Sequence, residues 1–191
     1  MKICMYGASS PDLEQIYFDK AFELGKKMAL RGHSLVFGGG DQGLMGACVR
    51  GLESEGGESV GVAPRFFDLP GILHKESTEF IFTDDMRERK KIMVELADAF
   101  VILPGGVGTF EEFFETFTLK QLGQLNKPIA VLNVEGYFDA LKALMDQSMD
   151  KGFMKRECGN LYGIFEEPDE LLDYMENVHE EPMDIYKLKL G

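Results

Sequence analysis

The chain has 191 residues, of which 45% are hydrophobic and 28% are charged, and this balance excludes a mainly disordered protein. Its length favours a single domain, residues 1–191, built around one core. The formal net charge of −13 argues against binding to nucleic acid or to an anionic membrane, because the overall field repels both, so an anionic ligand must be held by local groups.

Short apolar runs alternate with segments whose apolar residues repeat at helical spacing. This alternation predicts strands at 2–6, 34–37, 59–62, 79–83, 100–103 and 128–133, and helices at 12–31, 44–55, 86–98, after 109, at 137–151 and from 168, with an acidic tail from 166. The pattern is typical of the α/β class, with a doubly wound, Rossmann-like and mostly parallel sheet that carries helices on both faces. In such a fold the ligand binds at the carboxyl edge of the strands.

Cysteine usage and hydropathy favour a reduced, cytoplasmic protein. The three cysteines, Cys4, Cys48 and Cys158, lie far apart, with no histidine at metal-ligand spacing, so we expect neither a metal nor another cofactor. The apolar run at 2–6 is too short for a signal peptide, and the sequence has no stretch of 18 apolar residues that would cross a membrane.

Four apolar residues before Pro104 lead into a glycine-rich turn and then into an acidic helix start. Gly105, Gly106 and Gly108 can adopt positive φ and expose their N–H groups, and Thr109 stands where a helix N-cap is expected. Free N–H groups in a first helical turn attract phosphate, so we interpret this loop as a phosphate cradle. A purely structural turn would also use proline and glycine.

A second glycine-rich loop follows the strand at 34–37 and contains Gly38, Gly39, Gly40 and Gly43. Because the carboxyl ends of parallel strands share one edge of the sheet, we expect both loops to face one crevice. Glycines that only permit tight packing are the alternative.

A long irregular segment at 63–77, marked by Pro64, Pro70 and Gly71, is interpreted as a mobile lid. His74 lies within it. A lone histidine in a loop is usually a polar surface residue, and a ligand contact is the alternative.

The helix predicted at 86–98 carries several cations near its start, where the helix dipole disfavours them. With helical periodicity, Arg89 falls in the middle of the apolar face and Lys90 lies at its edge. An inward arginine needs an internal carboxylate or a bound anion, because an unpaired buried charge is very costly. We favour the bound anion.

Glu112 allows two interpretations. The core stripe of its helix is predicted to consist of Phe110, Phe113, Phe114 and Phe117. Glu112 lies on a different face of that helix. Glu112 has capping-box spacing from Thr109, and its carboxylate would then accept a hydrogen bond from the backbone N–H of Thr109. The same carboxylate suits catalysis equally well, and spacing alone does not separate the two.

Residues 104–112 resemble the motif Pro-Gly-Gly-x-Gly-Thr-x-x-Glu of the LOG family, the cytokinin riboside 5′-monophosphate phosphoribohydrolases that are often mislabelled lysine decarboxylases. Further similarity lies in the second glycine loop, in Met-Arg-Glu-Arg-Lys at 86–90 and in the segments 126–128 and 133–137, and it covers nearly the whole chain. The resemblance implies a hydrolase that releases adenine, or an N6-substituted adenine, from a nucleoside 5′-monophosphate. It also implies a homodimer with the site close to the subunit contact.

By this resemblance, Arg89 and Glu112 are the catalytic pair. The implied substrate and phosphate contacts are Gly39, Gly40, Gly43, Met86, Lys90, Pro104, Gly105, Gly106, Gly108 and Thr109. An apolar patch of Leu119 and Leu122, opposite the phenylalanine stripe, would suit the subunit contact. Many relatives carry histidine where this chain has Arg87, so no direct role is assigned to Arg87.

A non-catalytic protein of the same fold, which carries a nucleotide or a phosphorylated cofactor, is the alternative function. Arg89 and Glu112 discriminate between the two, because a carrier needs the loops but not that pair. A pyridoxal-dependent decarboxylase is rejected, because the chain is about half the usual size and offers no buried lysine with a pyridinium partner.

Overall fold

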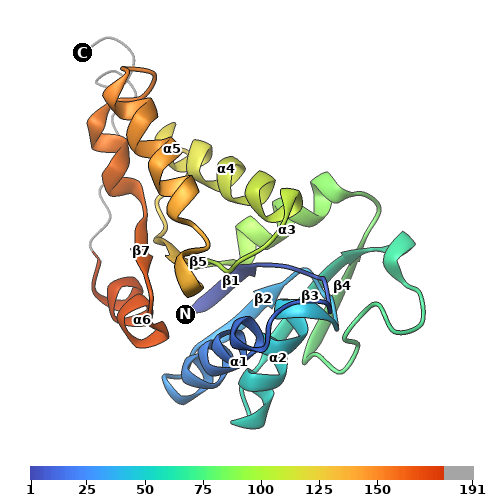
Figure 1. Cartoon of the computed structure of the whole chain (residues 1–191). Coiled ribbons are helices and arrows are strands. Elements are labelled where there is room, and N and C mark those ends of the chain that lie inside the picture. Colours follow the sequence, from blue (N-terminus) through green and yellow to red (C-terminus); the bar gives the residue numbers. More distant parts are fainter. Residues whose placement is uncertain (179–191) are drawn as a thin grey trace.

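The structure, a computed structural model, describes residues 1–178 and folds them around one seven-stranded sheet (Figure 1). The strand order is β4-β3-β2-β1-β5-β6-β7, and every neighbouring pair is parallel. The strands are β1 Lys2–Tyr6, β2 Ser34–Phe37, β3 Ser59–Pro64, β4 Glu79–Thr83, β5 Ala99–Ile102, β6 Ile129–Leu132 and β7 Gly163–Phe165. The predicted fold class is confirmed.

The described residues also form six α-helices and three short 3₁₀ helices. The α-helices are α1 Gln15–Leu30, α2 Gly43–Ser54, α3 Met86–Leu96, α4 Val107–Gln121, α5 Asp139–Asp150 and α6 Pro168–Asn177. The 3₁₀ helices are η1 Arg65–Phe67, η2 Val134–Gly136 and η3 Arg156–Leu161.

Helices cover both faces of the sheet, as predicted. One face carries α1, α2 and α6, which pack through residues such as Leu24, Leu52 and Leu171. The other carries α3, α4 and α5, with Met93 and Phe113 among the buried side chains. Strand β1 contributes alternate residues to the two clusters, as a central strand with both faces buried must.

Several predicted boundaries change. The strands predicted at 2–6, 34–37 and 79–83 are confirmed unchanged, whereas α1 begins at Gln15 and α3 ends at Leu96. The prediction that Phe114 belongs to the core stripe is wrong, because 37% of this residue is exposed. Leu119 and Leu122, expected to form an outward apolar patch, are both partly buried, and Leu119 packs against the core. The predicted acidic tail beyond 178 lies outside the described residues.

Two kinds of feature are absent from residues 1–178. None of the helices there is long and apolar enough to span a membrane. Within the same residues, no group of three or more histidine, cysteine or acidic side chains is arranged to hold a metal ion.

Candidate active site

The cleft lies where the winding of the sheet changes direction. Strands β1 and β5 are neighbours, and the helices that follow them, α1 and α4, cover opposite faces. The connections therefore diverge and leave a crevice at the carboxyl ends of the two strands. A cleft of about 330 Å³ occupies this place, lined by both glycine-rich loops, by residues 7–9 after β1 and by part of the β3–β4 connection. The expectation that both loops face one crevice is confirmed.

Helix α4 presents an uncapped amino terminus to this cleft. Its N-cap is Gly106, with no side-chain cap, and the first helical hydrogen bond runs from the N–H of Phe110 to the carbonyl of Gly106. The N–H groups of Val107, Gly108 and Thr109 precede that bond and have no partner within the helix. The prediction that Thr109 is the N-cap is wrong, because the helix begins two residues earlier.

In the first loop, Gly105 permits a close approach, and no glycine there is needed for an unusual backbone angle. Gly105, Gly106 and Gly108 can adopt positive φ, but none of the three does so here. A Cβ at Gly105 would come within 2.1 Å of the hydroxyl oxygen of Thr109, whereas one at Gly106 or Gly108 would meet nothing within 4 Å. The last two glycines therefore leave open space beside the helix start, and both line the cleft.

The second loop differs from the first. Gly39 and Gly43 adopt positive φ, as only glycine does readily. At the start of α2, the N–H of Leu44 already donates to the carbonyl of Ala8 at 2.8 Å. The cleft is lined here by Gly38, Gly40 and Met45, and not by Gly39 or Gly43. The loop thus shapes the wall of the cleft, and the helix start whose glycines line the cleft is that of α4.

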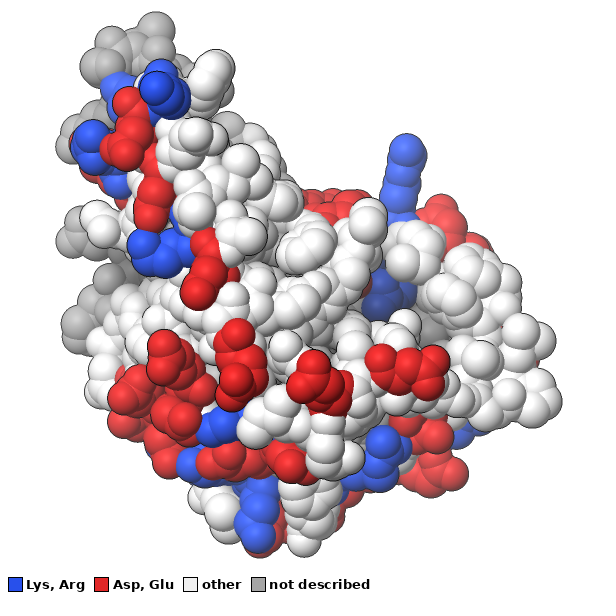
Figure 2. All heavy atoms as spheres, in the orientation of Figure 1, with Lys and Arg blue, Asp and Glu red and all other residues white. Residues whose placement is uncertain are grey.

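Arg89 and Glu112 meet at the bottom of the cleft. Arg89 Nη1 donates to Glu112 Oε1 at 2.9 Å, and Arg89 Nε donates to the carbonyl of Val62 at 3.1 Å. Each residue is only 8% exposed, and both line the cleft. Figure 2 shows basic atoms set back in a hollow whose rim is largely uncharged.

This pair corrects two expectations. Arg89 points inward as predicted, but its partner is an internal carboxylate, whereas a bound anion was favoured. The capping-box interpretation of Glu112 is wrong, because its carboxylate contacts Arg89 and its helix starts at Val107. The two residues approach each other from different helices, so helical spacing could not reveal the contact.

Burial and charge act in opposite directions on Glu112. Burial favours the neutral carboxyl and raises its pKa, while the charge and hydrogen bond of Arg89 lower it. Burial has the larger effect, so the pKa of Glu112 lies above its ordinary value. A carboxylate that is costly to ionise and paired with one arginine is typical of a functional site.

The other predicted site residues differ in whether they line the cleft. Met86, at the start of α3, lines it. Lys90 does not, and its ammonium group pairs with Glu111 and, at 2.8 Å, with Glu115. Pro104 and Gly105 lie behind the loop: the Pro104 carbonyl accepts the N–H of Ala8 at 3.0 Å, and the Gly105 carbonyl accepts the hydroxyl of Tyr137 at 2.6 Å.

Two contributors were missed. Gly38 lies against the arginine, since a Cβ there would come within 1.9 Å of Arg89 Nη2. The turn at 7–9 lines the cleft because it follows β1, and only the position of β1 in the sheet could have indicated this. His74 was expected at the surface, but it is buried at 6% exposure between carboxylates.

Known proteins resemble this chain in sequence over most of its length. The family described as "Possible lysine decarboxylase" matches residues 45–175. A cytokinin riboside 5′-monophosphate phosphoribohydrolase of Arabidopsis thaliana is 35% identical over 92% of this chain and 77% of its own. A probable enzyme of the same name from Oryza sativa subsp. japonica is 38% identical over 92% of this chain and 78% of its own. This chain belongs to the LOG family.

Solved structures of proteins with other names share the fold of this LOG family member. A molybdenum cofactor carrier protein from Chlamydomonas reinhardtii superposes with a TM-score of 0.69 at 24% identity, covering 92% of this chain and 97% of its own. A molybdenum cofactor binding protein from Rippkaea orientalis gives 0.70 at 19% identity, with 92% and 95% covered. At such identities the likeness shows a shared fold, and function must be argued from the site.

Proposed function

We propose that this LOG family chain hydrolyses the N-glycosidic bond of a purine nucleoside 5′-monophosphate and releases the free base and ribose 5-phosphate. The observation that carries the proposal is the buried ion pair of Arg89 and Glu112, which lines the cleft next to the uncapped start of α4. Relatives at 35% and 38% identity that are named for this reaction on cytokinin riboside 5′-monophosphate support it.

The start of α4 is the proposed phosphate site. Its free N–H groups and the positive end of the helix dipole attract an anion, and Gly106 and Gly108 leave room for one to approach the backbone. The chain as a whole, at −13, supplies no attraction. The phosphate therefore both anchors the nucleotide and sets its position along the cleft.

Glu112 is the proposed group that acts at the ribose. Cleavage of an N-glycosidic bond passes through an oxocarbenium-like state, which a nearby carboxylate stabilises. The base leaves with the bonding electron pair as this state forms, and water then adds to the sugar carbon. The proton that the water loses balances the one that the base takes up. Arg89 orients the Glu112 carboxylate through the 2.9 Å contact, and its positive charge favours departure of an electron-rich base.

The rim of the cleft supplies apolar surface for a flat base. Met45, Phe67, Ile72 and Met86 line it, and the last three are each about two-fifths exposed. Such surface suits a purine ring, and it suits adenine or an N6-substituted adenine better than a more polar base. The proposed substrates are adenosine monophosphate and its N6-substituted forms.

The decisive experiment separates the products of a substrate panel. Purified protein is incubated with adenosine monophosphate, an N6-alkyl derivative, the deoxy form, guanosine monophosphate and adenosine, with and without a chelator. We expect adenine release from the monophosphates, unchanged by the chelator, and a specificity constant for adenosine lower by about 10² to 10⁴. Equal turnover of adenosine and its monophosphate would contradict the phosphate site. Tight binding without base release would favour the carrier function.

A homodimer and a cytoplasmic location complete the proposal. The resemblance in sequence implies the dimer, and helix α4 exposes Val107 at 83% and Phe114 at 37%, apolar surface that a second subunit would cover. Sedimentation equilibrium at several protein concentrations measures the mass of the assembly. A monomer at every concentration would contradict the homodimer but not the proposed reaction.

A further inference from the structure

The returning half of the β3–β4 connection is fixed to the second glycine-rich loop. The backbone of residues 72–74 makes two hydrogen bonds with it: the N–H of Asp41 donates to the carbonyl of Ile72 at 2.9 Å, and the N–H of His74 donates to the carbonyl of Gly39 at 2.9 Å. Together these two bonds form the antiparallel bridge between Gly40 and Leu73. Because Ile72 and Leu73 line the cleft, this attachment sets the position of one of its walls.

The side chain of His74 adds a charged attachment at the same place. Its Nδ1 lies 2.9 Å from Asp41 Oδ1, and its Nε2 lies 2.9 Å from Glu53 Oε1 and 3.0 Å from Oε2. Asp41 belongs to the glycine loop and Glu53 to α2. One buried ring therefore joins the cleft wall to two separate elements.

The geometry of this contact requires a protonated ring. A neutral imidazole has one N–H, whereas a carboxylate only accepts hydrogen bonds, so two facing carboxylates are satisfied together only by an imidazolium. The other charged groups around the ring are Glu76, 3.7 Å from Nδ1, and Arg50, which contacts Asp41 at 3.0 Å. Burial disfavours the charge on His74, but the hydrogen bonds with Glu53 and Asp41 together outweigh it, and its pKa is raised.

We propose that His74 is a positioning residue: held as an imidazolium by Asp41 and Glu53, it fixes Ile72 and Leu73 as the cleft wall, and substrate affinity falls when the ring loses its proton. This inference rests on the proposed function for its kinetic consequence only. The sign follows from the raised pKa: the attachment is complete below the ordinary value of 6.5 and is lost as pH rises through the higher value of the folded protein.

The experiment compares Glu53→Gln and His74→Gln with His33→Gln. His33 is a matched control, because its side chain is also 8% exposed and bonded to a carboxylate, Glu176, but its neighbours in the chain do not line the cleft, whereas Ile72 and Leu73 beside His74 do. We expect His74→Gln to raise KM for adenosine monophosphate about tenfold with kcat within about twofold, and His33→Gln to change neither. In the unaltered enzyme KM should rise toward alkaline pH.

Glu53→Gln decides the matter if His74→Gln does not fold. It keeps the ring but removes one counter-charge, so the alkaline rise of KM should move to lower pH, together with the titration midpoint of the His74 ring proton in NMR spectra. The NMR midpoint is measurable even if the protein hydrolyses no nucleotide, which separates this inference from the proposed function. An unmoved midpoint, or KM values that are equal in His74→Gln and the unaltered enzyme, would overturn it.

Discussion

Glu112 has to be ionised for the proposed chemistry, although burial works against its charge. Replacing it by glutamine keeps an oxygen that accepts from Arg89 and removes the negative charge that would face the oxocarbenium ion. We expect Glu112→Gln to lower kcat by about 10² or more, with a melting temperature within a few degrees of the parent. Initial rates and calorimetry measure the two effects. Glu115→Gln, which changes a carboxylate outside the cleft, serves as control, and a fully active Glu112→Gln would contradict the assignment.

Arg89→Ala tests the other half of the pair. It leaves Glu112 buried without its counter-charge, so we expect a loss of about 3 kcal/mol in the free energy of unfolding near pH 8, and loss of activity. The pKa of Glu112 is already above its ordinary 4.5 and should rise further, so the penalty is absent below 4.5 and grows as pH rises through the folded value.

Urea titrations of Arg89→Ala at pH 5 and pH 8 measure this dependence. The double variant Arg89→Ala, Glu112→Gln should recover most of the lost stability, because no buried charge remains. An equal loss at both pH values, or no recovery in the double variant, would mean that the pair contributes to stability in another way.

At the scale of single elements, Gly38 is the point where the second loop meets Arg89. A Cβ at this position would lie 1.9 Å from Arg89 Nη2, and the guanidinium, which is bonded to Val62 and Glu112, has little freedom to move away. We expect Gly38→Ala to destabilise the protein by about 1–3 kcal/mol and to lower kcat about tenfold or more. Gly108→Ala is the stability control, because a Cβ there meets nothing within 4 Å, and its stability should be kept or raised. A stable and fully active Gly38→Ala would contradict the close approach.

The elements themselves were largely predictable, because their signals are local. Strands such as Ser34–Phe37 and Glu79–Thr83 are short, largely apolar runs between turn residues, and Asp85 caps α3 by accepting hydrogen bonds from the N–H groups of Arg87 and Glu88. Strand β7 has only three residues, too few to show a period. Its place beside β6 is set by tertiary packing, which sequence patterns do not reveal.

The site was predictable only where its signals are local in the sequence. The inward direction of Arg89 follows from helical periodicity, whereas its pairing with Glu112 joins α3 to α4 and depends on how the sheet places them. His74 was misjudged because its partners, Asp41 and Glu53, are 33 and 21 residues away in the chain. The sequence thus indicated Arg89 and Glu112 as candidate site residues, but not the contact between them.

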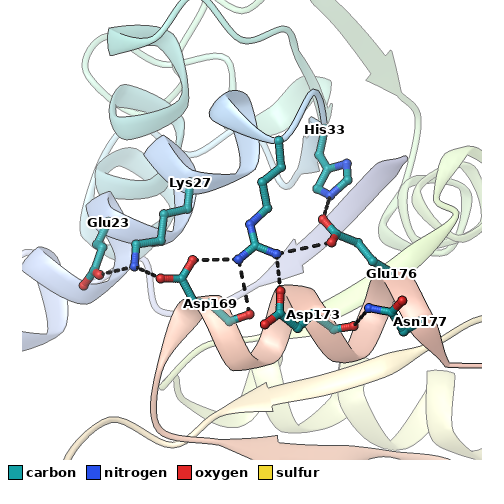
Figure 3. Close-up of polar contacts among 8 residues, drawn as sticks. Glu23, Lys27, His33, Asp169, Asp173, Glu176 and Asn177 are labelled. Atoms are coloured by element: carbon teal, nitrogen blue, oxygen red, sulfur yellow. Dashed lines mark hydrogen bonds and ion pairs between the residues drawn. The ribbon is translucent and has the colours of Figure 1, made fainter.

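At the scale of the whole molecule, α6 is fastened to α1 on the side of the sheet away from α4. Figure 3 shows acidic residues of α6 facing basic residues that end α1. Arg31 contacts Asp169 at 2.7 Å, Asp173 at 2.6 Å and Glu176 at 3.2 Å. Lys27 also bonds Asp169, and none of these residues lines the cleft. This network therefore concerns the stability of the fold and not the proposed chemistry.

Acid should weaken this network. The hydrogen bond from Lys27, followed by that from Arg31, lowers the pKa of Asp169 below its ordinary 3.8. A lowered carboxylate pKa contributes stability above the unfolded value, and this contribution is lost as pH falls through the folded value. The window lies below about pH 4, whereas His74 should lose its proton only above its ordinary value of 6.5.

Arg31→Ala removes three ion pairs at once, and it leaves Lys27 on Asp169 and His33 on Glu176 as the remaining contacts of these carboxylates. Exposed pairs contribute little singly, so for this half-exposed network we expect a loss of about 1 kcal/mol, or about 2–4 °C in melting temperature, with kcat and KM unchanged. In about 1 M salt the difference from the parent should shrink, because screening then acts over roughly 3 Å. Lys142→Ala, which removes one exposed pair with Asp146 on α5, should cost less. A salt-independent loss for Arg31→Ala would mean that the aliphatic part of its side chain, and not its charge, holds α6 to α1.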